Sequence, residues 1–183
     1  IDGFISQYDK RYLNSLLAYN KALQQRNALV KAEMADETLL DIWEEQMAQH
    51  GEYIFEKRSE FIDQFVPFFN EFHAFISQEK ESVSLEYHSQ LKERPNLKEM
   101  LKEVRQRDMI LGHTSRGIHK DDLDMKMGEL AIKKIGSQGQ NKTFLIALKL
   151  AQFDFLKRIV KTKPILLFDD IFDKLDAGRV QQI

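Results

Sequence analysis

Two long segments have the helical spacing of apolar residues, which predicts that much of this chain folds into long helices. The first runs from Ser6 to about Lys31, and its large apolar residues recur at alternating intervals of four and three. This spacing is typical of a helix that buries one stripe, and Arg26 takes one position within that stripe. The stripe comprises Tyr12, Leu16, Tyr19, Leu23 and Val30, widened by Leu13 and Leu17.

The second segment begins after Asp36, a residue type that caps helix starts, and runs to about Ser77. Gly51 and Pro67 are its weak points as a helix. Because only about five residues separate the two segments, they predict an antiparallel helical hairpin. The second stripe, which we interpret as core packing, comprises Trp43, Met47, Ile54, Phe61, Phe65, Phe68, Phe72 and Phe75.

Shorter elements follow the hairpin, and their patterns predict a mixture of strands and helices. The apolar run from Ile165 to Phe168 is typical of a strand buried on both faces. In chain order we predict a strand over 82–87, a helix over 96–107, a loop over 112–117, a hairpin over 122–135 that turns at Gly128 and Glu129, a helix over 143–159, a strand from Pro164 and a helix after Asp176.

Composition narrows the class of protein. The chain has no cysteine, which excludes a disulfide framework and favours a reducing compartment, so we expect a cytoplasmic protein. No apolar stretch approaches the roughly 20 residues that span a bilayer, so we expect no membrane partner. The net charge of -2 predicts that any DNA contact uses a local patch. Because the chain starts at Ile1 and stops at Ile183 within an expected helix, we expect a piece of a longer protein.

Two adjacent carboxylates end the expected strand over 165–168. Asp169 would lie at the C-terminal edge of a sheet, where open α/β folds bind ligands, and it could hold Mg²⁺. Asp170 could then polarise an attacking water molecule. Both residues could instead cap the following turn, and the pattern alone leaves the two interpretations open.

A second candidate site is Gly136-Ser137-Gln138-Gly139-Gln140, just before an apolar helical run. Ser137 and Gln140 have the spacing of a capping box, which needs no ligand. The same geometry offers free N–H groups and a hydroxyl to an anion at a helix N-terminus. We favour the anion site because the strand that carries the two carboxylates follows in the sequence.

Residues 136–143 read G-S-Q-G-Q-N-K-T, which differs from a phosphate-binding P-loop at one position. Asn141 stands where a P-loop has glycine, and its Cβ takes space that the loop needs around the β-phosphate. A degenerate P-loop is therefore the less favoured interpretation, and Lys142 is most simply a solvated residue of the first helical turn.

Three polar clusters are open to two interpretations each. The turn Gly117-Ile118-His119-Lys120-Asp121-Asp122 could face a phosphate or a metal, although we favour a solvated turn. Tyr53, Lys57 and Arg58 could touch DNA, although an exposed charged face is the simpler account. Asp176 either senses a partner subunit or caps the last helix.

Together these motifs resemble the RecF family of bacterial recombination mediators, a branch of the ABC-type ATPases. The segments 137–140 and 166–170 are similar to the family's signature and Walker B motifs, and 25–29 looks like part of its helical arm. The turn over 117–122 looks like the family's G-P-H-R-D-D, with Ile for Pro and Lys for Arg. The resemblance covers essentially the whole chain.

The fold that this resemblance implies is α+β and mainly α. A long antiparallel helical arm over 1–110 would be followed by part of a P-loop ABC-type ATPase head over 111–183, without the N-terminal Walker A lobe. Asp169 would help to hold Mg²⁺ and Asp170 would be the catalytic base for ATP on the same head. The segment 137–140 would meet ATP held by the opposite subunit, and Asp176 would lie on a loop that crosses the dimer interface.

The resemblance also implies an ATP-dependent homodimer that clamps double-stranded DNA near single-strand junctions. Such a clamp, with RecR and RecO proteins as partners, would help to load recombinase in gap repair, DNA replication and the SOS response to damage. The chain by itself would be inactive. Two alternatives stay open: a non-enzymatic helical interaction module, and a self-contained NTPase with a degenerate P-loop over 136–143.

Overall fold

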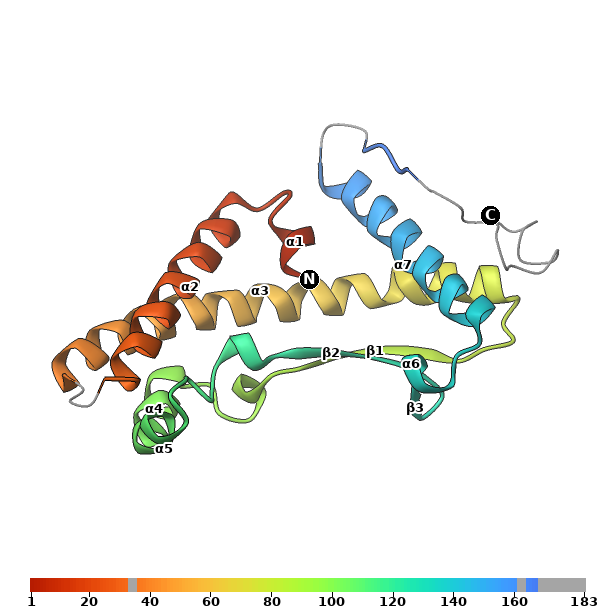
Figure 1. The fold of residues 1–183 in the computed structure, drawn as a ribbon. Coiled ribbons are helices and arrows are strands. Elements are labelled where there is room, and N and C mark those ends of the chain that lie inside the picture. The colour runs from red at the N-terminus through yellow and green to blue at the C-terminus, as the bar shows by residue number, and fades with distance from the viewer. Residues whose placement is uncertain (33–35, 161–163, 168–183) are drawn as a thin grey trace. The chain divides into compact units, whose positions relative to one another are not determined.

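The computed structural model describes residues 1–32, 36–160 and 164–167, and Figure 1 shows mainly helices with a small sheet. Spatial contacts divide the chain into two compact units. The first unit comprises Ile1–Glu60 and Tyr87–Asp122, and the second comprises Phe61–Glu86 and the chain from Leu123 onward. The domain boundary that we expect at residue 110 stays a prediction.

The first unit contains the expected helical hairpin, formed by α2 (Lys10–Val30) and the first part of α3 (Glu37–Ser77). Arg26 of α2 pairs with Glu44 of α3, while Tyr12 lies against Arg58. The later residue of α2 thus contacts the earlier residue of α3, and the earlier residue of α2 contacts the later one. This pairing confirms that the two helices are antiparallel.

Gly51 allows close packing inside this hairpin. A Cβ at Gly51 would lie 2.6 Å from the Leu97 side chain and 3.1 Å from the Tyr19 ring, and both of those side chains are buried. Asp36 accepts hydrogen bonds from two backbone N–H groups of the first turn of α3, which confirms the predicted N-cap. Neither Gly51 nor Pro67 ends the helix.

The predicted single helix over 96–107 is wrong, because two short helices occupy this region. They are α4 (Leu97–Glu103) and α5 (Arg105–Leu111), separated at Val104 by backbone angles outside the helical range. The break lets Asp108 of α5 reach the buried arginine of α2 at 2.6 Å. The remaining short elements of this unit are α1 (Asp2–Ile5), η1 (Gln90–Lys92) and η2 (Ile118–Lys120).

The described strands form a three-stranded sheet in the order β1, β2 and β3. Their bounds are Val83–His88, Asp122–Met127 and Leu130–Ala131, and β2 pairs antiparallel with β3. The predicted second strand of the hairpin is therefore only two residues long, and helix α6 (Ile132–Ile135) follows it. Of the two apolar residues of α6, Ile132 is buried but Ile135 is 47% exposed, so they do not form the buried face that a longer strand would need.

Aromatic rings form the core of the second unit, where α7 (Gln138–Ile159) packs on the later part of α3. The Phe155 ring lies 5.4, 6.0 and 5.6 Å from the centroids of Phe61, Phe65 and Phe68. Nearer the start of α7, the ring centroids of Phe144 and Phe69 lie 4.7 Å apart.

The buried stripe of α3 differs from the expected one in its last turns. Phe69 and Ile76 are fully buried, whereas Phe75 is 57% exposed. The interval of four from Phe61 through Phe65 to Phe69 keeps the stripe on the face towards α7, and the expected 4,3 alternation places Phe72 and Phe75 off that face.

The predicted buried strand from Pro164 is wrong for the residues that the structure describes. Pro164 to Leu167 form no strand, and Ile165 and Leu167 are 86% and 87% exposed. A strand buried on both faces needs neighbouring strands and covering helices, and no described strand pairs with these residues.

No helix in the described part of the chain is long and apolar enough to cross a membrane.

Candidate functional site

The start of α7 confirms the capping box in the predicted signature segment. Ser137 is the N-cap, and its Oγ accepts a hydrogen bond from the backbone N–H of Gln140 at 3.2 Å. In return, the side chain of Gln140 accepts one from the backbone N–H of Ser137 at 2.8 Å. The two bonds hold the first turn of α7 in one geometry.

The same helix start is open to a ligand. Ser137 and Gln138 are exposed, while Gly139 and Gln140 are half-buried. Within the described residues, nothing accepts a hydrogen bond from the backbone N–H of Gln138 or Gly139. Such N–H groups carry the positive end of the helix dipole, so an anion can bind here without disturbing the capping box.

The geometry contradicts a P-loop at residues 136–143. A P-loop curls around phosphate between a strand and a helix, whereas here the short helix α6 precedes the segment and α7 already begins at Gln138. Asn141 lies inside α7, and its side chain donates to the carbonyl oxygens of Gly136 and Ser137 at 2.8 and 3.0 Å. The self-contained NTPase therefore loses its expected phosphate site.

The three acidic residues predicted for this site, Asp169, Asp170 and Asp176, lie outside the described residues. Their roles stay predictions. Elsewhere in the part of the chain that the structure describes, no group of three or more His, Cys, Asp or Glu side chains is arranged to hold a metal ion.

The turn over 117–122 is not the solvated turn that we favour from sequence. The side chains of Asp121 and Arg58 are only 3% and 9% exposed, and they pair at 2.9 Å. Arg58 also donates to the carbonyl oxygen of Ile118 at 2.8 Å and to both carboxylate oxygens of Asp2 at 2.8 Å. The suggestion that Arg58 touches DNA is therefore wrong, because its guanidinium is committed inside the protein.

Two phenols complete this cluster, in which the pKa values of the two carboxylates shift in opposite directions. Tyr12 donates to Asp2, and Tyr87 donates to Asp121 at 2.5 Å. Burial by itself raises the pKa of Asp2, but the hydrogen bonds from Arg58 and Tyr12 outweigh it and lower that pKa. Burial dominates at Asp121 and raises its pKa despite the same kinds of hydrogen bond.

His119 fastens the same turn to α2. Its Nε2 lies 3.1 Å from the carbonyl oxygen of Thr114 and must donate to it, so Nδ1 accepts a hydrogen bond from the Tyr19 hydroxyl at 2.9 Å. Burial lowers the pKa of His119, which favours the neutral form of the ring. Gly117 has φ 123°, and a Cβ there would lie 2.7 Å from the Tyr19 hydroxyl, so this turn requires glycine.

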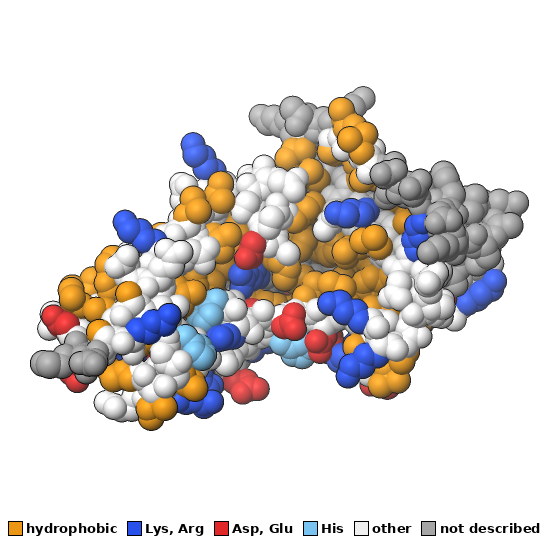
Figure 2. Space-filling view, viewed as in Figure 1, with side chains coloured by type: hydrophobic (Ala, Val, Ile, Leu, Met, Phe, Trp, Pro, Cys, Tyr) orange, Lys and Arg blue, Asp and Glu red, His pale blue; other side chains and the backbone are white. Residues whose placement is uncertain are grey.

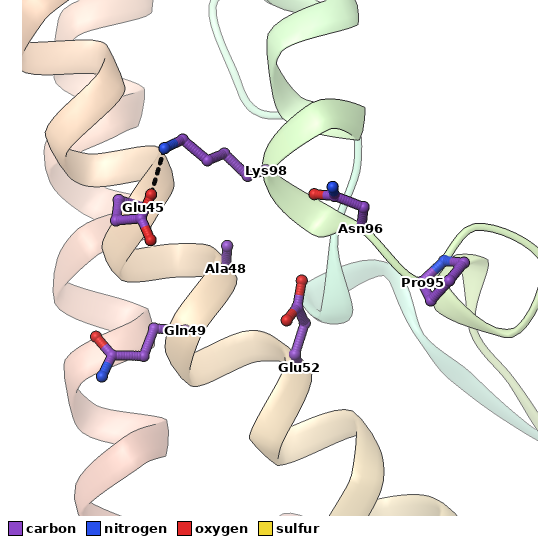
Figure 3. Close-up of a pocket in the computed structure, with 7 residues that line it drawn as sticks. All are labelled: Glu45, Ala48, Gln49, Glu52, Pro95, Asn96 and Lys98. Carbon is purple, nitrogen blue, oxygen red and sulfur yellow. Dashed lines mark hydrogen bonds and ion pairs between the residues drawn. The ribbon is translucent and has the colours of Figure 1, made fainter.

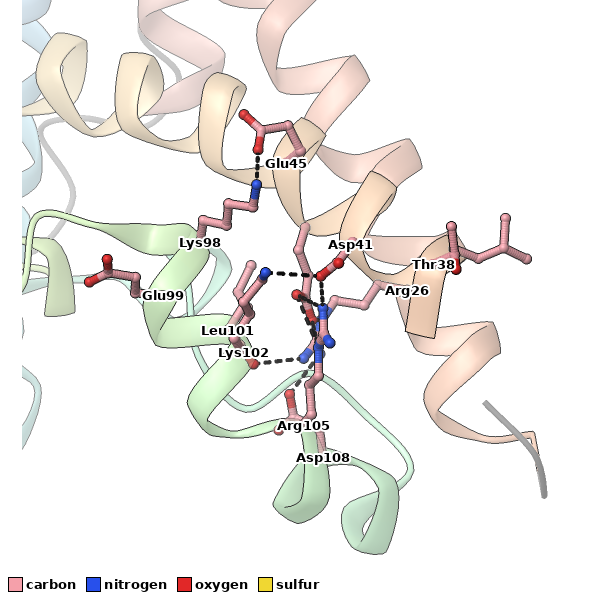
Figure 4. Close-up of polar contacts among 12 residues, drawn as sticks. Arg26, Thr38, Asp41, Glu45, Lys98, Glu99, Leu101, Lys102, Arg105 and Asp108 are labelled. Carbon is pink, nitrogen blue, oxygen red and sulfur yellow. Dashed lines mark hydrogen bonds and ion pairs between the residues drawn. The ribbon is translucent and has the colours of Figure 1, made fainter. Parts of the chain in front are cut away.

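The predicted arm motif around Arg26 is a buried ionic junction (Figure 4). Arg26 is fully buried, and it donates to Glu44 at 3.1 Å and to Asp108 at 2.6 Å. A second arginine, Arg105, reaches Glu44 at 2.6 Å from the other side. An arginine within an apolar stripe signals buried carboxylate partners, but the sequence does not identify which carboxylates they are.

A surface recess of about 520 Å³ lies between α3 and the start of α4 (Figure 3). Ala48 and Pro95 line it, and an exposed ion pair between Lys98 and Glu45 lies at its edge. Glu52, which also lines it, accepts a hydrogen bond from a backbone N–H of α4 at 3.2 Å. The polar groups of this recess are largely satisfied by one another, so it does not stand out as a binding site.

Comparison with known proteins gives one consistent result. No protein-family model matches the chain. The proteins named "DNA replication and repair protein RecF" from Bacteroides thetaiotaomicron and Bacteroides fragilis are each 59% identical over the whole chain, and that from Porphyromonas gingivalis is 49% identical. The chain spans about half the length of the curated relatives that it matches.

Solved structures agree with the sequence comparison. A structure described as the recombination mediator RecF with ATP in the RecFOR pathway matches 98% of the chain with a TM-score of 0.85 and 31% identity. A second, described with ATPrS, matches 97% with a TM-score of 0.86 and 32% identity. In each case the match covers 51% of the solved chain. Sequence and fold agree along the whole length of the chain, so the chain belongs to the RecF family. It spans about half the length of the family members that it matches.

Proposed function

We propose that this chain forms part of an ATP-dependent DNA clamp that acts in recombinational repair. In this proposal, two heads close around ATP, and the start of α7 on one head meets the γ-phosphate held by the other. The observation that carries the proposal is that the backbone N–H groups of Gln138 and Gly139, beside the Ser137 hydroxyl, donate to no described residue. The RecF structures described with ATP and ATPrS support a nucleotide ligand for the full-length protein.

The remaining parts of the mechanism follow from the family resemblance. Asp169 helps to hold Mg²⁺, Asp170 acts as general base towards water, and Asp176 lies on the loop that crosses between the heads. ATP joins the two heads and its hydrolysis releases them. The clamp holds double-stranded DNA near single-strand junctions and helps recombinase loading, in the cytoplasm and within the SOS response. RecO and RecR proteins are the proposed partners, in line with the pathway named for the solved relatives.

The test uses the full-length protein with the substitution Asp170→Asn. This change keeps the size of the side chain but removes the proposed base, so ATP should still drive dimerisation while turnover stops. Sedimentation velocity with and without ATP measures the dimer, and phosphate release measures turnover. Gln152→Ala, on the body of α7, is the matched control and should leave both unchanged. A variant Asp170→Asn that stays monomeric with ATP, or that hydrolyses ATP normally, would contradict the proposal.

A further inference from the structure

Helix α2 and the segment over 109–120, which runs from the end of α5 through a loop to η2, carry no acidic residue, although the chain as a whole is acidic. We call this segment the loop over 109–120. The chain has 29 Asp and Glu among 183 residues, so about five would be expected in these two segments at the average density. Instead, the segments contain lysines and arginines together with neutral amides such as Asn20 and Gln24. Absence of one sign of charge over two neighbouring segments marks a surface that suits a partner of that sign.

The loop and the helix form one continuous surface within the first unit. The side chain of Asn27 accepts hydrogen bonds from Thr114 at 2.8 and 2.7 Å, and Tyr19 bonds His119 at 2.9 Å. The loop therefore runs antiparallel along α2. We name this face the α2–loop surface, and its exposed cations are Lys10, Lys21, Lys31 and Lys120, with the half-buried Arg116 among them.

Three of these cations are ready for an external partner. Lys21, Lys31 and Lys120 are exposed, and their side chains form no hydrogen bond or ion pair with any described residue. Glu44 of the neighbouring helix α3 is buried against Arg26, so it does not neutralise these lysines. Figure 2 shows separate Lys and Arg side chains on the face that carries α2, with Asp or Glu side chains at the edges of this region.

We propose that the α2–loop surface binds the phosphate backbone of double-stranded DNA. Lys10 and Lys31 are separated by about 31 Å along the helix, which corresponds to about nine base pairs of duplex. Lysines on a helix face make sequence-independent phosphate contacts, so the surface would give affinity without base recognition. This inference rests on the proposed function, since it names the surface by which the clamp would hold DNA.

The experiment measures binding of the full-length protein to a short fluorescent duplex by anisotropy over a range of salt concentrations. The triple variant Lys21→Gln, Lys31→Gln, Lys120→Gln should bind about 10- to 100-fold more weakly at low salt. Its plot of log affinity against log salt should be shallower by about 0.9 for each phosphate group that no longer pairs with a lysine. The control variant Lys80→Gln, Lys149→Gln, Lys157→Gln removes the same charge from the second unit and should change affinity far less.

Each outcome bears on one proposal. Equal weakening by both triple variants would show a bulk charge effect and overturn the α2–loop surface, as would normal DNA binding by the first variant. Loss of an acidic protein partner with DNA binding intact would also overturn it. ATP-driven dimerisation without DNA should be unchanged in both variants, and if the wild-type protein does not dimerise with ATP, the proposed function fails independently of this surface.

Discussion

The guanidinium of Arg26 and the carboxylate of Glu44 are both fully buried and lie 3.1 Å apart, joining the two helices of the hairpin. Asp108 adds a second carboxylate at 2.6 Å, and Arg105 a second cation. A buried ion pair is costly to desolvate, so its chief consequence is what happens when one member is removed.

Replacing Arg26 by leucine should destabilise the first unit by about 3–5 kcal/mol, because Asp108 would stay buried without its cation and Glu44 would keep only Arg105. Urea denaturation of the full-length protein measures this free energy of unfolding. Arg94→Ala removes an arginine from the exposed pair with Glu103 and should have little effect. Equal effects of the two substitutions would show that the buried junction has no special role.

His119 predicts a dependence of stability on pH. Its pKa is lowered in the folded state, mainly by burial, so the unfolded state binds a proton more readily. The stability that the neutral ring provides is present above the usual histidine pKa of about 6.5 and is lost as pH falls through the lower folded value. Thermal melting over this pH range should show the loss.

The variant His119→Gln should weaken that dependence on pH, because glutamine does not titrate. His113→Gln changes an exposed histidine and is the control that should keep the wild-type profile. An unchanged profile in His119→Gln would assign the pH dependence to other groups.

Gly117→Ala should destabilise the protein by about 2–3 kcal/mol, because φ is 123° and the new methyl group meets the Tyr19 hydroxyl. Gly3→Ala, where no atom lies within 4 Å, is the control. In the Tyr19→Phe background the same alanine should cost less, since the clashing oxygen is absent. Strict additivity of the two changes would argue against the clash.

Phe155→Ala should destabilise the second unit by about 3–5 kcal/mol, because its ring contacts three rings of α3. Phe75→Ala removes a ring that is 57% exposed and should cost much less. Thermal melting, followed by circular dichroism, distinguishes the two variants. A larger effect from Phe75 would show that this face of α3 is covered in the full-length protein.

Local patterns predicted the parts of the fold that depend on local physics. The N-cap at Asp36 and the capping box at Ser137 follow from cap chemistry alone. The α2 stripe follows from spacing at Tyr12, Tyr19 and Val30, which are buried, but the widening by Leu17 is wrong because that side chain is 60% exposed. The partners of Arg26 do not follow from local patterns, because Glu44 and Asp108 are distant in sequence and only the folded chain brings them together. The break at Val104 escaped prediction for the same reason.

The same contrast between local patterns and long-range contacts applies to the candidate site. The capping box at the start of α7 was predictable because it depends only on local spacing, whereas the anion site there stays a prediction. The turn over 117–122 was misjudged as solvated, since polar residues such as Asp121 are usually exposed unless a partner like Arg58 neutralises them. The apolar run after Pro164 was misjudged because a buried strand needs neighbours that the described residues do not supply.

The central claim is that Ser137 serves ATP held by the opposite head, while Asp170 serves ATP on its own head. Two full-length variants test it directly. Ser137→Glu places a negative charge where the γ-phosphate is expected, and Asp170→Asn removes the proposed base. Each variant alone should be inactive in ATP hydrolysis.

When the two variants are mixed, a dimer with one copy of each contains one site in which both Ser137 and Asp170 are intact. An equal mixture should therefore recover up to about a quarter of the wild-type hydrolysis rate, if dimers form at random. A mixture that stays as inactive as its two components would contradict the account, because it would place Ser137 and Asp170 at the same head's nucleotide or remove one of them from the site.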